Sequence, residues 1–197
     1  MAWNLGLLGA TVVSEVPNAY ELLETTVLGG TASSVTFSNL NSNYGSTYQH
    51  LQIRFVFRPT ATDTSLMARM NGDGNGGNYN GVWFEGSGTG AGQSSRTDTN
   101  SLIFFYPQDF SNSASGAFYV GILDILDPFE TTKNTTIRCF LGSSATNPKV
   151  GLATGAWFNT AALTSFGLSV GTGNPAPWQG SNFNTNSRFS LYGIKGA

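Results

Sequence analysis

The segment Gln49–Arg58, with the sequence QHLQIRFVFR, decides the fold class because apolar and polar residues alternate along it. Side chains two residues apart share a face of a β-strand, whereas a helix repeats about every 3.6 residues. One face of the segment carries Leu51, Ile53, Phe55 and Phe57, and the other carries His50, Gln52, Arg54 and Arg58. The pattern predicts an antiparallel strand with one face in a core and one polar face.

Further segments have the same character, being short runs rich in Val, Ile, Phe and Thr between clusters of Gly, Asn, Ser and Pro. They are Val35–Leu40, Ser65–Met70, Tyr79–Glu85, Ser101–Tyr106, Phe118–Leu126, Thr135–Gly142, Val150–Phe158, Leu163–Val170 and Arg188–Ile194. No helical pattern of comparable length separates them, which favours a sandwich over a parallel α/β sheet. We therefore predict an all-β, antiparallel, jelly-roll-like β-sandwich over residues 25–197.

Residues 1–24 differ from the rest because they are richer in Leu and Val, with Pro17 before Tyr20. A loose arm of this composition would be poorly soluble, so we expect it to contact another subunit or a neighbouring protein. The residues expected to make this attachment are Trp3, Leu5, Leu7 and Leu8. A first strand of the same sheet is the alternative, and the sequence leaves it open.

The composition favours burial against copies of the same chain over binding to nucleic acid. Charged residues make up 10 % of the chain, against about 25 % in an average soluble domain, and aromatic residues make up 13 %. Charge is depleted at the centre of interfaces, so we expect a homo-oligomer, most simply a trimer. The net charge of −2, without a basic run, provides no field for binding phosphates, so no nucleic acid is expected.

Cysteine usage and hydropathy exclude several other classes. Cys139 is the only cysteine, which rules out an intrachain disulfide and a zinc site of paired cysteines, and we expect no cofactor. No apolar run approaches about 18 residues, so we expect no membrane insertion. The N-terminus lacks the basic start of a secretory signal, so we expect synthesis in the cytoplasm.

Candidate catalytic residues are few, and we predict that the protein is not an enzyme. His50 is the only histidine and lies on the polar face of its strand, where packing is expected. Asp124 and Asp127 are the natural pair for glycoside cleavage, but their odd spacing places them on opposite faces unless Asp127 belongs to a turn before Pro128. The preferred interpretation is a turn at Asp127 and a pairing of Asp124 with Arg138 across a hairpin.

The run NGDGNG at residues 71–76 resembles the first half of a calcium loop, with Asp73 and Asn75 as candidate ligands. It begins with Asn71 rather than Asp, and Val82 stands at position twelve, where a bidentate Glu is needed. The preferred interpretation is a tight hairpin loop that Asp73 and Asn75 stabilise.

Three segments resemble a group of short virion proteins of tailed phages, especially those of cyanobacteria and other aquatic bacteria. The first is YELLETTVLGGTASSVTFSNL at residues 20–40, which leads into YQHLQIRFVFR at 48–58. The second is LMARMNGDGNGGNY at 66–79, and the third is residues 164–196, which close with RFSLYGIKG. The resemblance covers about half of the chain. It implies a β-sandwich in a phage structural protein, without catalytic residues, and leaves open a place in the head, a fibre or the tail.

Two functions are compatible with these features. The first is a non-enzymatic, oligomeric structural protein of the virion, in contact with other virion proteins. The second is recognition of a host-surface polysaccharide through the polar segments Gly86–Asn100 and Gly171–Asn186, which we expect to be long surface loops. The candidate stacking platforms for a sugar are Trp178, Trp83, Tyr79 and Trp157.

Overall fold

The computed structural model describes residues 19–61, 64–87, 90–97, 102–105, 118–143, 148–172 and 178–196. The attachment residues expected in the arm, Trp3, Leu5, Leu7 and Leu8, lie outside these ranges.

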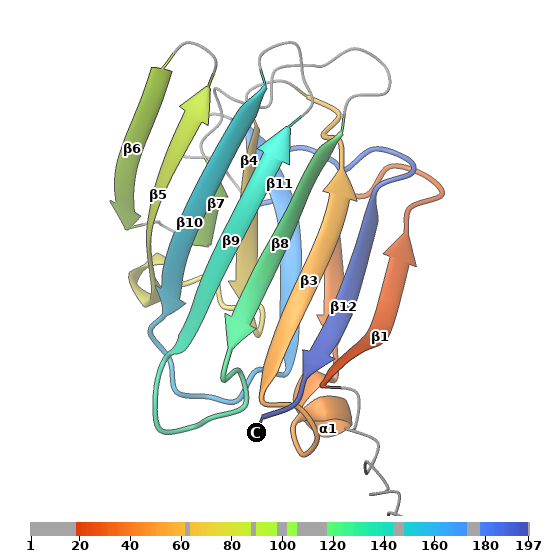
Figure 1. The fold of residues 1–197 in the computed structure, drawn as a ribbon, viewed down its shortest axis with the longest axis vertical. Helices are drawn as coiled ribbons and strands as arrows, with labels where there is room; N and C mark the ends of the chain where they lie inside the picture. Colours follow the sequence, from red (N-terminus) through yellow and green to blue (C-terminus); the bar gives the residue numbers. More distant parts are fainter. Residues whose placement is uncertain are drawn as a thin grey trace, which may run out of the picture.

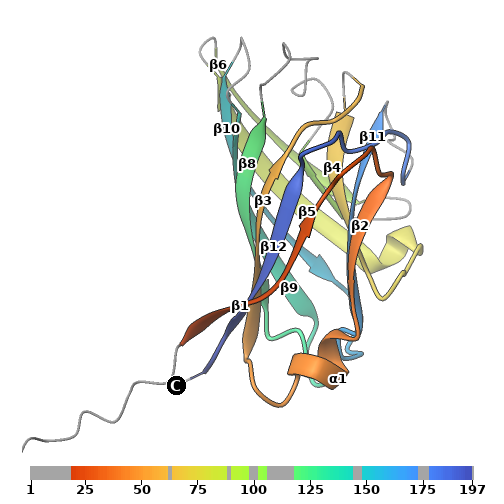
Figure 2. The ribbon, with the colours of Figure 1, turned by 90° about the vertical axis from the view of Figure 1, so that its right-hand side faces the viewer.

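The described chain forms two antiparallel sheets that pack face to face (Figures 1 and 2). The eight-stranded sheet consists, in spatial order, of β1 (Tyr20–Val27), β12 (Arg188–Ile194), β3 (His50–Phe57), β8 (Tyr119–Leu126), β9 (Thr135–Ser143), β10 (Lys149–Trp157), β5 (Tyr79–Ser87) and β6 (Gly90–Thr97). The four-stranded sheet consists of β2 (Ser34–Ser38), β11 (Ser165–Thr172), β4 (Thr64–Met70) and β7 (Leu102–Phe105). Two short helices, α1 (Leu40–Tyr44) and the 3₁₀-helix η1 (Gly76–Asn78), lie in connections.

The predicted antiparallel β-sandwich is confirmed, and each predicted strand has a counterpart within a few residues of its expected bounds. The finer assignment to a jelly roll stays a prediction. One strand, β6, was missed, and β1 corresponds to the alternative of a first strand that the sequence left open. The expected boundary at Glu24 falls inside β1, so residues 20–24 belong to the sheet. The loop expected over Gly86–Asn100 contains β6, whose sequence GAGQSSRT lacks an apolar alternation but pairs with β5 along its whole length.

The core lies between the two sheets and begins from the inward residues of β3. Leu51, Ile53 and Phe57 are fully buried, as their alternation predicts. Phe57 packs edge-on against Phe183, with ring centroids 5.4 Å apart, and beside Tyr119 at 5.6 Å. Phe183 enters the core from the segment before β12, where its main chain bridges to Ala32 and Pro59. The connections therefore close the end of the sandwich with an aromatic cluster.

Gly121 is required by close packing in the middle of the sheet. It lies opposite Phe55 on β3, and a Cβ at this position would stand 2.4 Å from the Phe55 ring and 2.8 Å from the carbonyl oxygen of Phe140. We expect Gly121→Ala to lower the free energy of unfolding by about 2 kcal/mol, because overpacking forces the ring and the backbone to move. Urea denaturation measures this, with Gly29→Ala as the control, since nothing lies within 4 Å of a Cβ there. An equal loss in both variants would contradict the packing argument.

Candidate functional site

The face of the eight-stranded sheet that points away from the core, called the outer face below, is unusually apolar. The structure exposes eleven large hydrophobic side chains among the described residues, and ten of them occupy outward positions of this sheet. They are Tyr20, Leu22, Val27, Val56, Val82, Phe84, Val120, Ile122, Phe140 and Val150. The eleventh, Phe158, follows β10 and lines a hollow on the same side. Exposed apolar side chains gathered on one face are typical of an interaction site.

The centre of the outer face is a line of apolar side chains across four neighbouring strands, called the apolar row. Ile122 lies opposite Phe140, Phe140 opposite Leu152, and Leu152 opposite Phe84. Phe140 and Phe84 are 54 % and 55 % exposed, respectively, so about half of each ring is in water. A shallow, mainly apolar hollow of about 300 Å³ lies between these two rings and Val150. The row exists because each of the four strands, β8, β9, β10 and β5, carries an apolar side chain on its outward face as well as on its inward face.

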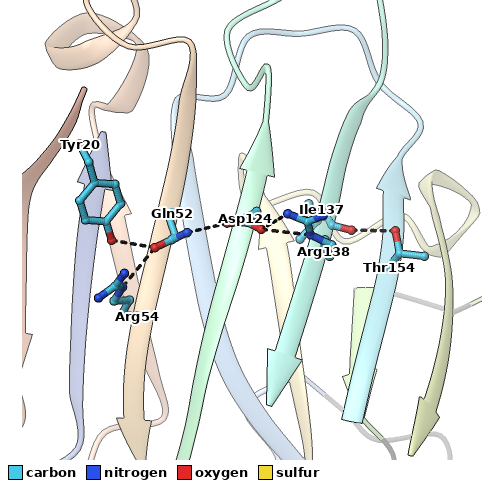
Figure 3. A network of polar contacts seen from close by, with 7 residues as sticks. All are labelled: Tyr20, Gln52, Arg54, Asp124, Ile137, Arg138 and Thr154. Atoms are coloured by element: carbon cyan, nitrogen blue, oxygen red, sulfur yellow. Dashed lines mark hydrogen bonds and ion pairs between the residues drawn. The ribbon is translucent and has the colours of Figure 1, made fainter. Parts of the chain in front are cut away.

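Beside the apolar row runs a chain of hydrogen bonds from β1 to β9, called the polar row (Figure 3). The Tyr20 hydroxyl donates to Gln52 Oε1 at 2.7 Å, and Gln52 Nε2 donates to Asp124 Oδ1 at 2.8 Å. Arg138 then donates to Asp124 Oδ2 from Nη2 at 2.7 Å and from Nε at 3.1 Å. Arg54 Nε also donates to Gln52 Oε1, at 3.2 Å. The polar groups of the row therefore hold one another in fixed positions.

Stacked rings hold the β1 end of the polar row. The rings of Tyr20 and Tyr192 stack with centroids 4.7 Å apart, and the Arg54 guanidinium lies over both, at 5.2 and 5.4 Å. Charged residues are rare on the rest of the face. In the seven neighbouring strands β1, β12, β3, β8, β9, β10 and β5, the outward positions hold three arginines and one acid. These are Arg54, Arg138, Arg188 and Asp124. Their sum is +3 − 1 = +2, in a chain of net charge −2.

The two aspartates considered for glycoside cleavage have separate partners. Asp124 pairs with Arg138 across the β8–β9 hairpin, as predicted. Asp127 lies in the turn after β8 with a φ of 47°, which confirms the turn interpretation. Its carboxylate forms an ion pair with Lys133, and this hydrogen bond is the main cause that holds the pKa of Asp127 below its usual value. His50 Nδ1 accepts a hydrogen bond from the main-chain N–H of Asp127 at 3.0 Å.

The candidate calcium loop is held together by its own side chains. Asp73 Oδ1 accepts from the main-chain N–H of Asn75 at 2.8 Å, and Asp73 Oδ2 accepts from Asn78 Nδ2 at 2.8 Å and from Trp157 Nε1 at 2.7 Å. Asn75 Oδ1 accepts from the N–H of Gly77. The described residues contain no group of three or more His, Cys, Asp or Glu side chains placed to hold a metal ion. Asp73 and Asn75 stabilise this loop, as predicted, but the expected hairpin was wrong, because the loop joins β4 of the four-stranded sheet to β5 of the eight-stranded sheet.

Three of the four candidate sugar platforms are core residues. Tyr79 is fully buried, Trp157 is 1 % exposed and Trp83 is 5 % exposed, so their rings cannot stack on a sugar, and this prediction was wrong. The physical reason is that these rings occupy the inward positions of β5 and β10. Trp178 is partly exposed and packs against Met67 of the four-stranded sheet. The centroid of its ring lies 4.6 Å from the guanidinium carbon of Arg69. The outer face does not include it.

Sequence reasoning missed the outer face as a site. The signal was present in Phe118–Leu126, where Val120 and Ile122 occupy the face opposite Leu123 and Ile125. A half-exposed strand should alternate, and a strand that is apolar on both sides indicates that both faces become covered.

Comparisons with known proteins add little to this description. No protein-family model matches the sequence, and no curated protein matches it. The solved structures include alginate lyase vAL-1 from Chlorella virus, which is 10 % identical, with 88 % of this chain and 83 % of that chain covered and a TM-score of 0.29. A score this low supports no inference about activity. Of the helices in the described part of the chain, none has the length and hydropathy that a membrane crossing requires.

Proposed function

We propose that this chain is a non-enzymatic structural component of a bacteriophage particle, which assembles with copies of itself through the outer face. The observation that carries the proposal is the concentration of exposed apolar side chains on that one face. Its resemblance to short phage virion proteins supports a place on the head surface, in a fibre or in the tail. Its location is then the virion, after synthesis in the host cytoplasm.

The dimensions of the outer face suit a stable contact between copies. The sheet is roughly 34 Å wide, because its eight strands lie about 4.8 Å apart. Its strands are about eight residues long and each residue advances about 3.3 Å, so the face measures roughly 900 Å². A standard interface buries about 800 Å² on each partner. A second copy suits this face better than a charged partner does, because the face is largely apolar and its polar row is already internally paired.

A structural role also agrees with the state of the polar groups. Asp124, which a hydrolase would need as a free acid or base, is held between Gln52 and Arg138. Cys139 is fully buried, and burial raises the pKa of its thiol, so the thiolate that reacts with oxidants is suppressed. A particle that cannot be repaired benefits from few reactive groups and from covered sheet surfaces.

The Phe140→Ser substitution tests the proposal. We expect the wild-type chain to be an oligomer, most simply a trimer of three times 20.8 kDa. The substitution should raise its dissociation constant by about 30-fold or more, because a central aromatic contact contributes roughly 2 kcal/mol. Light scattering over a concentration series measures this. Phe140→Leu, which stays apolar, is the matched control and should remain assembled. A wild-type chain that is monomeric at all concentrations contradicts the proposal.

A second candidate, recognition of a host-surface glycan, rests on Trp178, whose ring stays partly exposed outside the outer face. We expect Trp178→Ala to abolish binding on a glycan array while the solution mass stays unchanged, if this function is present. Trp178→Phe is the control that keeps an aromatic face. A binding signal that is the same in Trp178→Ala and wild type would remove Trp178 from consideration.

A further inference from the structure

The described part of the chain begins at one edge of the eight-stranded sheet. β1 is an edge strand, and its pairing with β12 shifts register between Leu22 and Glu24, a bulge that bends the strand. Figure 2 shows the beginning of β1 and the end of β12 turning together away from the body of the sandwich. The N–H of Lys195 donates to the carbonyl of Ala19 at 3.0 Å, so this ribbon continues to the first described residue. The first described residue therefore lies at the tip of a ribbon that projects from the body of the sandwich.

The composition of residues 1–18 matches what the outer face lacks. The segment MAWNLGLLGATVVSEVPN contains Trp3, three leucines and three valines. Its single charged side chain is the acidic Glu15, and it has no lysine or arginine. The outer face is apolar with a local charge of +2 from three arginines and one aspartate. The two surfaces are thus complementary in both hydrophobicity and sign of charge.

The length of the segment is sufficient to cross a whole face. Eighteen extended residues span up to about 60 Å. The eight-stranded sheet, with seven spacings of about 4.8 Å, is roughly 34 Å wide. An apolar strip of this length would cover both the apolar row and the hollow beside Phe84.

We propose that residues 1–18 of one copy lie across the outer face of a neighbouring copy, so that the subunits are joined by exchanged N-terminal arms. The proposal rests on the proposed self-assembly and names the segment that covers the face. Exchange between copies is preferred over folding back because the beginning of β1 projects away from the body of the sandwich (Figure 2).

Mixed disulfide formation between two single-cysteine variants tests the proposal. One chain carries Leu5→Cys, Leu7→Cys or Leu8→Cys, and the other, with a size tag, carries Thr154→Cys or Thr136→Cys on the outer face. Both threonines are exposed there. Because the new cysteines are on different chains, a linked pair on a non-reducing gel reports contact between copies only. Cys139 remains as the fully buried background thiol.

The control is Ser38→Cys, an exposed position on the other sheet. We expect co-expressed chains to yield at least tenfold more mixed disulfide with an outer-face cysteine than with Ser38→Cys. If light scattering shows an oligomer but no arm cysteine exceeds the Ser38→Cys level, the arm exchange is overturned while the proposed self-assembly stands. If the wild-type chain is monomeric, the self-assembly falls and the arm exchange falls with it.

Discussion

Replacing Phe57 with alanine is expected to lower the free energy of unfolding by about 4 kcal/mol, the largest stability loss of any substitution considered for this chain. Phe57 is fully buried, and its ring lies 5.4 Å from Phe183, 5.6 Å from Tyr119 and 5.7 Å from Phe55, measured between centroids. Deleting such a ring removes its transfer free energy and leaves a cavity, which costs about 3–5 kcal/mol for Phe→Ala. The loss falls on the cluster that joins β3, β8 and the segment before β12.

Urea denaturation followed by tryptophan fluorescence measures this loss, at one fixed protein concentration because the proposed self-association would add to stability. The matched control is Phe158→Ala, the same substitution at a ring that is 47 % exposed. We expect the control to lose less than about 1 kcal/mol of folding stability, since little apolar area leaves the core. A loss below about 1 kcal/mol in Phe57→Ala would show that the aromatic cluster does not hold the sheets together.

The second large effect is expected at Asp73, where we predict that alanine lowers the free energy of unfolding by about 3 kcal/mol. Its carboxylate accepts from Trp157 Nε1, Asn78 Nδ2 and the N–H of Asn75, and its carbonyl accepts from the Tyr79 hydroxyl. Trp157 is 1 % exposed, so removing its acceptor orphans an indole N–H in the interior. Each buried donor left unpaired costs about 1–3 kcal/mol.

The same carboxylate makes stability dependent on pH in a defined direction. Burial alone would raise the pKa of Asp73, but the hydrogen bonds from Trp157, Asn78 and Asn75 outweigh it and lower the pKa below its ordinary value. A lowered pKa in the folded state stabilises the fold above the unfolded value of about 3.9 and loses this contribution as the pH falls through the folded value. The stability difference between wild type and Asp73→Asn should therefore be greatest above pH about 5 and shrink below about 4.

Adding calcium or a chelator distinguishes a loop held by hydrogen bonds to Asp73 from a loop that binds a metal ion. Because all three donors come from the protein, we expect neither millimolar Ca²⁺ nor EDTA to shift the melting temperature of the wild type. A rise in melting temperature with Ca²⁺ that disappears in Asp73→Asn would instead restore the loop as a cation site. A pH profile that is identical in wild type and Asp73→Asn would contradict the hydrogen-bonded hub.

The parts of the fold that could be predicted are those in which one strand face is apolar and the other is polar. β3 is such a strand, and its inward and outward residues were assigned correctly. The hairpin pair Asp124 and Arg138 followed from the same alternation, because opposite charges on facing strands attract. β6 could not be found in this way, since GAGQSSRT has no apolar face and is held by main-chain hydrogen bonds to β5.

The candidate site was harder to predict because its strands are apolar on both sides. In β5 the inward residues are Tyr79 and Trp83 and the outward ones are Val82 and Phe84, and nothing local tells the two sets apart. The choice of face is made by partners that are distant in sequence, such as Trp157 on the neighbouring strand β10, which lies opposite Tyr79. Periodicity reports local geometry alone, so it could not show that three of the four aromatic residues chosen as surface platforms, Tyr79, Trp83 and Trp157, lie in the core.

The position of β12 between β1 and β3 determines when the protein can fold. β12 is the most C-terminal of the described strands, yet it separates two of the earliest, and the side-chain contact from Thr25 to Ser190 closes a loop of 165 residues. During synthesis β1 has no neighbour and β3 keeps a free edge until residue 194 has left the ribosome. Pairings this distant are slow to form, so the sheet is completed only after translation of β12. The outer face is therefore complete only after β12 has taken its place between β1 and β3, and the proposed association through this face would follow that step.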